Sequence, residues 1–180
     1  MERTEFRLTG SGGQGVIMLG VILADCAIKE GHNAIQSQSY GPEARGGASK
    51  CEVILGEKEI NFPKVQRPNL LLALTQDAAD KYAHNLNKEC LVIIDESVEL
   101  SSNTGSDTII KLPILVTARD KVGKDITANI VALGAINQLM NLFDDEHLFE
   151  VILDHVPKGT EVLNRRALDA GIQIVKDYHG

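Results

Sequence analysis

Residues 6–28 read FRLTGSGGQGVIMLGVILADCAI, and this stretch decides the fold. From Phe6 to Thr9 the side chains alternate and the run stops at a glycine, which predicts a β-strand. The glycine-rich loop of residues 10–15 follows. From Val16 to Ile28 the sequence is almost wholly apolar, and its length favours a buried helix over a strand. A strand, a glycine loop and a helix in this order are typical of an α/β domain.

The rest of the chain extends this pattern. Alternating polarity predicts strands at residues 33–39 and 50–55, whereas residues 70–74 and 91–95 are apolar runs that suit strands buried on both faces of a parallel sheet. A weaker strand is predicted over residues 107–112, and helices after Thr75 and over residues 125–142, 145–155 and 160–178. We therefore expect one domain over residues 1–180: an α/β, Rossmann-like fold with a mostly parallel sheet, flanking helices, and helices gathered at the C-terminal end.

Composition excludes several classes of protein. The chain has 180 residues, 43% hydrophobic and 24% charged, with a net charge of −7. Its basic residues are scattered, so we expect no nucleic-acid partner. No apolar run approaches the roughly 18 residues of a membrane span, and the charged start predicts no signal peptide. Cys26, Cys51 and Cys90 are widely spaced, which suits a reducing cytoplasm and buried thiols rather than a cluster or metal site in this chain.

The glycine loop has the spacing of a dinucleotide-binding fingerprint, with Gly10, Gly12 and Gly15 at its three glycine positions and Gly13 between them. Such glycines let backbone amides approach an anion at a helix start. However, the fingerprint expects an acid at the end of the second strand, and residues 33–39 carry none. Three interpretations stay open: a nucleotide site, a tight structural turn, or a contact with another anion or a partner. Gln14 can both donate to and accept from a ligand.

A second candidate loop reads YGPEARGG, residues 40–47. Arg45 could bind a carboxylate or phosphate, Glu43 could orient Arg45 or accept a proton, and Tyr40 offers a hydroxyl and a stacking face. Alternatively, Glu43 and Arg45 form an ion pair that only shapes a turn. Because both loops end strands, we expect both at the carboxyl edge of the sheet, where such folds bind ligands. The candidate residues of this loop are Tyr40, Gly41, Glu43, Arg45, Gly46 and Gly47.

Other polar residues allow two interpretations. Asp95 and Thr75 each end a predicted strand, and each could contact a ligand or cap a helix. The histidines fall in turns or late helices, where we expect solvated side chains. Asn129 and Asn137 lie on an apolar helix with several small residues, which could be core or a subunit interface. Core is the favoured interpretation.

The two loops together, in this order and at this spacing, resemble the gamma subunit of 2-oxoacid:ferredoxin oxidoreductases. The resemblance rests on GSGGQG at residues 10–15 and SYGPEARGGAS at residues 39–49. It continues more weakly through residues 73–76, 94–97 and 128–135, and through Asn164, Ala167 and Gly171. The form PEARGGAS looks most like the 2-oxoglutarate branch, since pyruvate-type members more often carry a second arginine where Ala44 stands. The pyruvate or ketoisovalerate branch is the alternative.

This resemblance implies a subunit of a complex that converts a 2-oxoacid and coenzyme A to an acyl-CoA and carbon dioxide while it reduces ferredoxin. Thiamine diphosphate and iron–sulfur clusters would belong to partner chains, namely alpha, beta and a ferredoxin-like delta subunit, and this chain would bind no cofactor alone. The gamma subunit would close over the active site and contribute to the coenzyme A path. It implies no catalytic acid or base at the two loops, so the isolated chain should be inactive.

Two other functions compete with this one. A stand-alone nucleotide-binding module would follow from the glycine loop alone. A purely structural assembly subunit would keep the loops without any role at the reaction centre.

Overall fold

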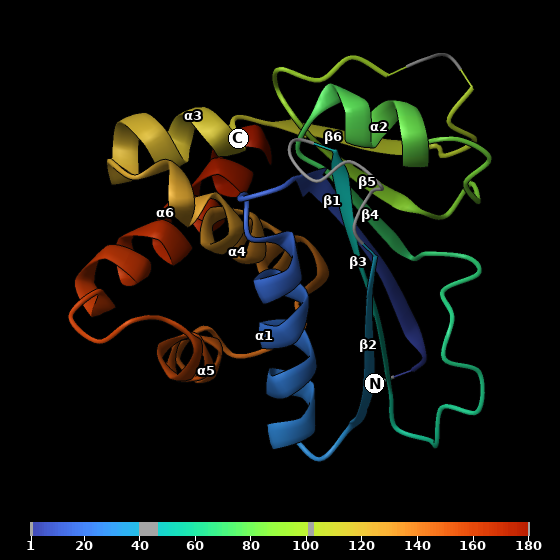
Figure 1. The fold of residues 1–180 in the computed structure, drawn as a ribbon, viewed down its shortest axis with the longest axis horizontal. Coiled ribbons are helices and arrows are strands. Elements are labelled where there is room, and N and C mark those ends of the chain that lie inside the picture. Colours follow the sequence, from blue (N-terminus) through green and yellow to red (C-terminus); the bar gives the residue numbers. More distant parts are fainter. Residues whose placement is uncertain (1, 40–46, 101–102, 180) are drawn as a thin grey trace.

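The computed structural model describes residues 2–39, 47–100 and 103–179. Its centre is one sheet with the strand order β2-β3-β1-β4-β5-β6 (Figure 1). The strands are β1 (Thr4–Ser11), β2 (Asn33–Ser39), β3 (Ala48–Gly56), β4 (Leu70–Ala73), β5 (Leu91–Asp95) and β6 (Thr108–Leu112). The strands β1, β4, β5 and β6 pair in parallel, as predicted. The strand β3 pairs antiparallel with both β1 and β2, so it alone runs the opposite way in a mostly parallel sheet.

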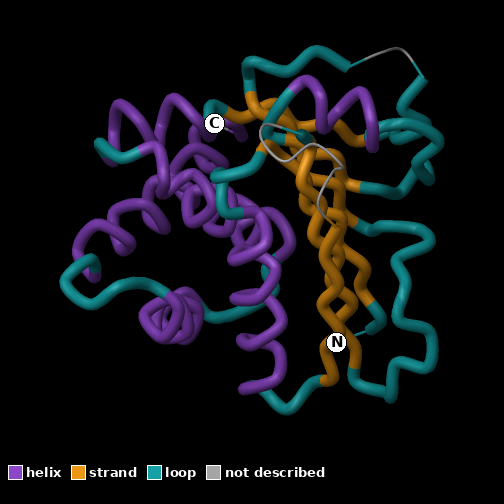
Figure 2. The backbone as a smooth tube through the Cα atoms, viewed as in Figure 1, coloured by secondary structure: helices purple, strands orange, loops and turns teal. Residues whose placement is uncertain are grey.

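The helices lie mainly on one face of this sheet (Figure 2). They are α1 (Val16–Lys29), α2 (Gln76–Tyr82), α3 (Ile114–Val116), α4 (Ala128–Met140), α5 (Asp145–His155) and α6 (Glu161–His179). A π-helical stretch, Thr117–Val122, continues α3, and a 3-10 turn, Asp125–Thr127, precedes α4. The expected gathering of helices at the C-terminal end is confirmed. No helix among the described residues is long and apolar enough to cross a membrane.

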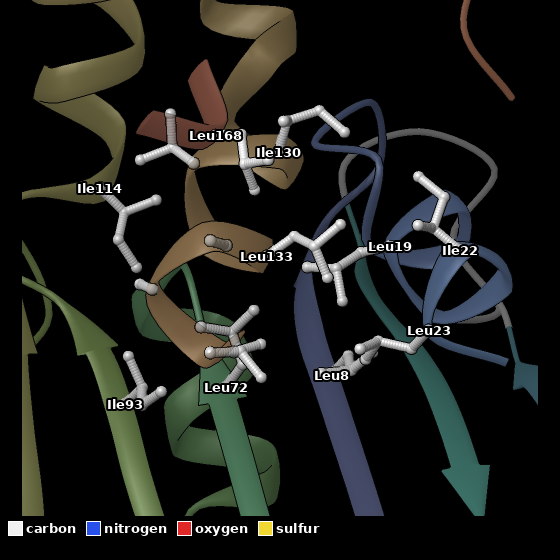
Figure 3. Close-up of a cluster of buried hydrophobic side chains, with 14 of the residues drawn as sticks. Leu8, Leu19, Ile22, Leu23, Leu72, Ile93, Ile114, Ile130, Leu133 and Leu168 are labelled. Atoms are coloured by element: carbon white, nitrogen blue, oxygen red, sulfur yellow. The ribbon is translucent and has the colours of Figure 1, made fainter. Parts of the chain in front are cut away.

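The strands alternate their side chains between two apolar layers. Leu70 and Leu72 of β4 point into the larger layer with α1, α4 and α6, whereas Leu71 and Ala73 point toward α2 on the opposite face. Figure 3 shows part of the larger layer, where side chains of the sheet such as Leu8, Leu72 and Ile93 meet side chains of α1 and α4 such as Leu19 and Leu133. Burial on both faces explains why the central strands read as unbroken apolar runs.

The helix α4 lies in the middle of the larger layer. All ten residues from Ala128 to Asn137 are buried. Asn137 uses its side-chain amide to bind the backbone N–H and C=O of Phe143, each at 3.0 Å, and so fixes the turn into α5. The favoured interpretation of this helix as core is therefore confirmed.

Candidate functional site

The two candidate loops leave the sheet at one shared edge. Ser11, the last residue of β1, pairs with Ala48 at the start of β3, and Ser39, the last residue of β2, pairs with Lys50. The ends of β1 and β2 thus flank the start of β3, as the prediction of a common edge requires. Of the second loop, only Gly47 falls within the described residues. The candidates Tyr40, Gly41, Glu43, Arg45 and Gly46 lie outside them.

The glycines of the first loop have different surroundings. Gly15 has a positive φ of 72°, and a Cβ there would lie 2.7 Å from the Nδ2 of Asn129. Gly13 also has a positive φ, 90°, but a Cβ would meet no atom within 4 Å. Gly12 is equally open and is exposed. Gly15 is therefore required by close packing, whereas Gly12 and Gly13 leave backbone accessible to another molecule.

Gln14 folds back across its own loop. Its side-chain Oε1 accepts a hydrogen bond of 2.8 Å from the backbone N–H of Ser11. A Cβ on Gly10 would lie 2.5 Å from this oxygen, so Gly10 is the residue that leaves room for the fold-back. The acceptor that we expected to face a ligand is thus used within the loop, and the amide nitrogen remains as a donor.

Two long helices begin beside this loop without side-chain caps. Gly15 is the N-cap of α1 and Thr127 that of α4, and neither makes a capping bond through a side chain. The first turn of α1 also carries no acidic residue. At α1, open N–H groups and the positive end of the helix dipole both favour a hydrogen-bond acceptor or an anion. At α4, the preceding 3-10 turn continues into the helix: the N–H of Ala128 donates to the carbonyl of Asp125, and that of Ile130 donates to the Oδ1 of Asn129.

A cavity of about 580 Å³ opens between these helix starts, and we call it the glycine-loop cavity. Three separate segments form its walls: residues 11–18, residues 126–130 and residues 156–164. Ser49, at the start of β3, adds a contact from the shared edge. The glycine loop is thus one wall of a real cavity and not only a turn.

Two buried asparagines reach this cavity, Asn129 and Asn164, each 5% exposed. Asn164 donates to the backbone carbonyl and to the hydroxyl of Thr160, at 3.0 and 2.9 Å. Asn129 accepts a 3.0 Å bond from the N–H of Ile130, and its Nδ2 has no partner among the described residues. Neither was among the predicted site residues, although a polar side chain on an otherwise apolar helix was a usable signal.

Asp95 and Thr75 act as caps. The carboxylate of Asp95, 1% exposed, accepts from Ser97 and from the backbone N–H of Leu115 at 2.8 Å, and so ties the end of β5 to the start of α3. Thr75 accepts from the N–H of Ala78 at the start of α2. Of the two interpretations left open by the sequence, the structure favours capping for both residues.

The cysteines are free thiols, and all three are buried. Burial raises the pKa of Cys26 to about 12 and that of Cys90 to about 11, and it raises the pKa of Cys51 as well. Thiols with such pKa values stay protonated at neutral pH and are poor nucleophiles. In the part of the chain that the structure describes, no group of three or more His, Cys, Asp or Glu side chains could hold a metal ion.

Two histidines lie at the α1–α5 contact, where the expectation of solvated side chains was wrong. The Nε2 of His155 lies 2.9 Å from the Oδ2 of Asp25, and this hydrogen bond holds the pKa of Asp25 below its ordinary value. The Nε2 of His147 is buried without a hydrogen-bond partner, 4.0 Å from a Glu30 oxygen. Lys29 completes the group through Asp25 and Asp154. These polar contacts attach α5 to α1.

Comparison with known proteins places this geometry in a family. The family model described as "Pyruvate ferredoxin/flavodoxin oxidoreductase" matches residues 5–174. A 2-oxoglutarate synthase subunit KorC from Methanocaldococcus jannaschii is 43% identical, over 97% of this chain and 95% of the relative. The ketoisovalerate oxidoreductase subunit VorA from Methanothermobacter thermautotrophicus is 33% identical, over 95% of this chain but only 36% of its own length.

A solved structure agrees with these sequence matches. The gamma subunit of a keto/oxoacid ferredoxin oxidoreductase from Geobacter sulfurreducens superposes with a TM-score of 0.85 at 38% identity, and 99% of each chain is covered. The resemblance first seen in the two loops therefore extends over almost the whole chain, and the chain belongs to the pyruvate ferredoxin/flavodoxin oxidoreductase family.

Proposed function

We propose that this chain is the gamma subunit of a 2-oxoglutarate:ferredoxin oxidoreductase. The complex oxidatively decarboxylates 2-oxoglutarate and transfers the acyl group to coenzyme A, giving succinyl-CoA and carbon dioxide, while the two electrons released reduce ferredoxin. The observation that carries the proposal is the 43% identity to a 2-oxoglutarate synthase subunit over nearly the full length of both chains.

The division of labour in the complex is part of the proposal. Thiamine diphosphate and iron–sulfur clusters are placed on alpha, beta and ferredoxin-like delta partners, and residues 1–180 form a single gamma-type domain. The match of the family model to residues 5–174 and the single continuous sheet support that organisation. The three buried free thiols support a cytoplasmic location.

We further propose that the two loops face the reaction centre. Gly10, Gly12, Gly13, Gln14, Gly15 and Gly47 lie along the shared edge, where open backbone at Gly12 and Gly13 and uncapped N–H groups of α1 suit contact with a carbonyl or an anion. For Tyr40, Gly41, Glu43, Arg45 and Gly46 the support is the sequence motif. The role we assign to Arg45 is contact with an anionic group of a substrate.

Purification of the tagged chain from its native source tests this function. We expect larger thiamine-binding chains and a ferredoxin-like chain to co-purify, and the complex to reduce ferredoxin when both 2-oxoglutarate and coenzyme A are supplied. Pyruvate and 2-ketoisovalerate serve as competing substrates. Preferential use of either one would move the complex to the other branch, and activity of the chain alone would contradict the proposal.

The Arg45→Ala variant separates a role at the reaction centre from a purely structural one. Loss of an anion contact at the reaction centre should reduce kcat/KM for coenzyme A or 2-oxoglutarate by about tenfold or more, because hydrogen bonds to charged groups contribute about 1.5–3 kcal/mol. Size-exclusion chromatography must show an intact complex. An intact Arg45→Ala complex with wild-type kinetics would leave the assembly role as the better description.

A further inference from the structure

We infer that a second cavity, on the face of the sheet opposite the α1 layer, is the docking surface for an extended acidic segment of a partner subunit. The cavity has a volume of about 600 Å³, and we call it the sheet-face cavity. Its walls are residues 35–37 of β2, Arg7 of β1, Lys50 and Glu52 of β3, and residues 63–65 of the loop between β3 and β4. The inference rests on the proposed function in one respect, namely that a partner subunit exists.

The sheet-face cavity lies over the antiparallel half of the sheet. Arg7 alternates along β1 with Phe6 and Leu8, which point into the layer with α1, so Arg7 points to the opposite face. Glu52 of β3 lies directly opposite Arg7, and Ser37 of β2 lies directly opposite Glu52. One row of polar side chains therefore crosses three strands and reaches the edge of the sheet.

The charged side chains of this cavity leave one positive charge without a counter-charge among the described residues. The Nε of Arg7 lies 2.8 Å from one carboxylate oxygen of Glu52, and the Nζ of Lys50 lies 3.1 Å from the other. One carboxylate thus serves two cations, whose side chains are only 20% and 23% exposed. The neighbouring acid, Glu5, is paired with Arg3 at 2.7 Å. Because a partly buried charge without a counter-charge is costly, an occupant that brings a carboxylate is favoured.

The same side chains keep hydrogen-bond donors that such a carboxylate can use. A guanidinium has five N–H donors and an ammonium has three. Arg7 donates to Glu52 and, at 3.4 Å, to the backbone carbonyl of Val65, and Lys50 has Glu52 as its ion-pair partner. Lys64 on the loop wall is exposed and has no ion pair among the described residues. The cavity thus has three basic side chains and one acidic side chain, in a chain with a net charge of −7.

The loop that forms the outer wall is long and irregular, but it is fastened to β1. It contains no helix or strand between the end of β3 and the start of β4 (Figure 2). The carboxylate of Glu5 accepts hydrogen bonds from the backbone N–H groups of Gln66 and Arg67, at 2.9 and 3.1 Å. Arg3 donates to the carbonyl of Phe62 at 3.3 Å. Long loops held in this way are typical of binding loops, because little further ordering is needed when a partner arrives.

Two features favour a polypeptide over a free anion as the occupant. The strand β2 is at the edge of the sheet, reads NAIQSQS, and has neither the charges nor the proline by which edge strands avoid pairing. Phe62, next to the cavity-lining Pro63, is 48% exposed, and aromatic side chains are enriched at interfaces. An extended segment can pair with β2 and place an acidic side chain between Arg7 and Lys50.

Two lysine-to-glutamate variants test the docking surface as a matched pair. Lys64→Glu reverses a charge on the cavity wall, whereas Lys58→Glu reverses a charge on the same loop outside the cavity. Both lysines are exposed, and both variants change the net charge equally, so both should keep the wild-type melting temperature. In the co-expressed complex, with association measured by exchange of a labelled chain, we expect Lys64→Glu to weaken it by about tenfold or more and Lys58→Glu to leave it unchanged.

Lys50→Gln tests the uncompensated charge separately, because it leaves Arg7 and Glu52 as a balanced pair. The isolated variant should keep the wild-type melting temperature, while its association in the complex should weaken by about tenfold. Added salt should also weaken association of the wild-type complex more than that of the Lys64→Glu complex. If Lys50→Gln does not fold, the matched pair still decides the question. Wild-type association of the Lys64→Glu chain would overturn the inference.

Other occupants would be recognised by their own signatures, and each would overturn the assignment. A homodimer of the isolated chain that Lys64→Glu dissociates would identify a second copy. Binding of inorganic phosphate or succinate that Lys64→Glu abolishes, with assembly intact, would identify a site for a small anion. Failure of the wild-type complex to use 2-oxoglutarate would count against the proposed function, but not against the docking surface.

Discussion

Gly15 and Gly12 belong to one loop but have opposite surroundings. Gly15 combines a φ of 72° with a position against Asn129, whereas a Cβ on Gly12 would meet no atom within 4 Å. The glycine fingerprint is defined by spacing alone, so it does not distinguish the role of Gly12 from that of Gly15. At the scale of single residues, the fingerprint therefore combines a glycine needed for packing with glycines that leave backbone open.

This difference predicts the stability of two alanine variants. Gly15→Ala should lower the free energy of unfolding by about 1–3 kcal/mol, since the left-handed backbone and the contact with Asn129 both oppose a Cβ. Gly12→Ala should change it by less than about 0.5 kcal/mol. Urea denaturation of the two purified variants measures the difference. Equal losses in both would show that the loop is not packed as described.

The Asp25–His155 contact predicts a pH dependence. The pKa of Asp25 is lowered in the folded chain, chiefly by its hydrogen bond with His155. Its contribution to stability is therefore complete above the unfolded-state pKa of about 4 and is lost as the pH falls through the lower folded-state pKa. We expect Asp25→Asn to cost about 0.2–1 kcal/mol at about pH 5.5, the range of partly exposed pairs, and less near pH 3. A cost that does not shrink in acid would contradict this linkage.

At the scale of elements, α4 and α6 are in backbone contact at two glycines. A Cβ on Gly171 would lie 2.0 Å from the carbonyl oxygen of Val131, and one on Gly134 would lie 2.4 Å from that of Leu168. A residue with a side chain at either position would force the helices apart. The same crossing holds α4 in place, and the start of α4 forms one wall of the glycine-loop cavity.

At this crossing, replacing glycine by alanine should destabilise the folded chain, although alanine has the higher helix propensity. Alanine normally stabilises a helix by about 1 kcal/mol relative to glycine. We nevertheless expect Gly171→Ala to lower the free energy of unfolding by about 1–3 kcal/mol, the range for overpacking. The exposed Gln173→Ala variant on the same helix is the control and should stay within about 0.5 kcal/mol of wild type. Thermal and urea denaturation of both variants measure these effects, and a more stable Gly171→Ala chain would contradict the close packing.

Element boundaries could be predicted well where periodicity was strong. The strands Asn33–Ser39 and Leu91–Asp95 and the helix Asp145–His155 have the bounds that the sequence predicted. The helical stretch over residues 114–122 was not predicted, because it is partly π-helical and lacks a regular 3.6-residue pattern. The direction of β3 was equally inaccessible, since alternating side chains look the same in parallel and antiparallel strands.

At the scale of the whole molecule, the glycine loop could be predicted from the sequence but the cavity around it could not. Its walls come from residues 11–18, 126–130 and 156–164, which are far apart along the chain. Asn129 looked like a core residue, and it is one, yet its amide also reaches the cavity. Only the fold shows that a buried helix presents its first turn to a surface. Sequence patterns report local periodicity and cannot report such convergence.

The reversal of β3 fixes how the two candidate loops stand relative to each other. Because β3 runs back beside β2, the chain leaves the sheet after Ser39 and re-enters it at Ala48 along the same edge. Ser39 is paired with Lys50 of β3, and Ser11, at the glycine loop, is paired with Ala48 of the same strand. One antiparallel strand therefore sets the spacing between the ends of β1 and β2. A slip of β3 by one residue would shift one strand end against the other and would also turn the buried side chains of β3 to the wrong face.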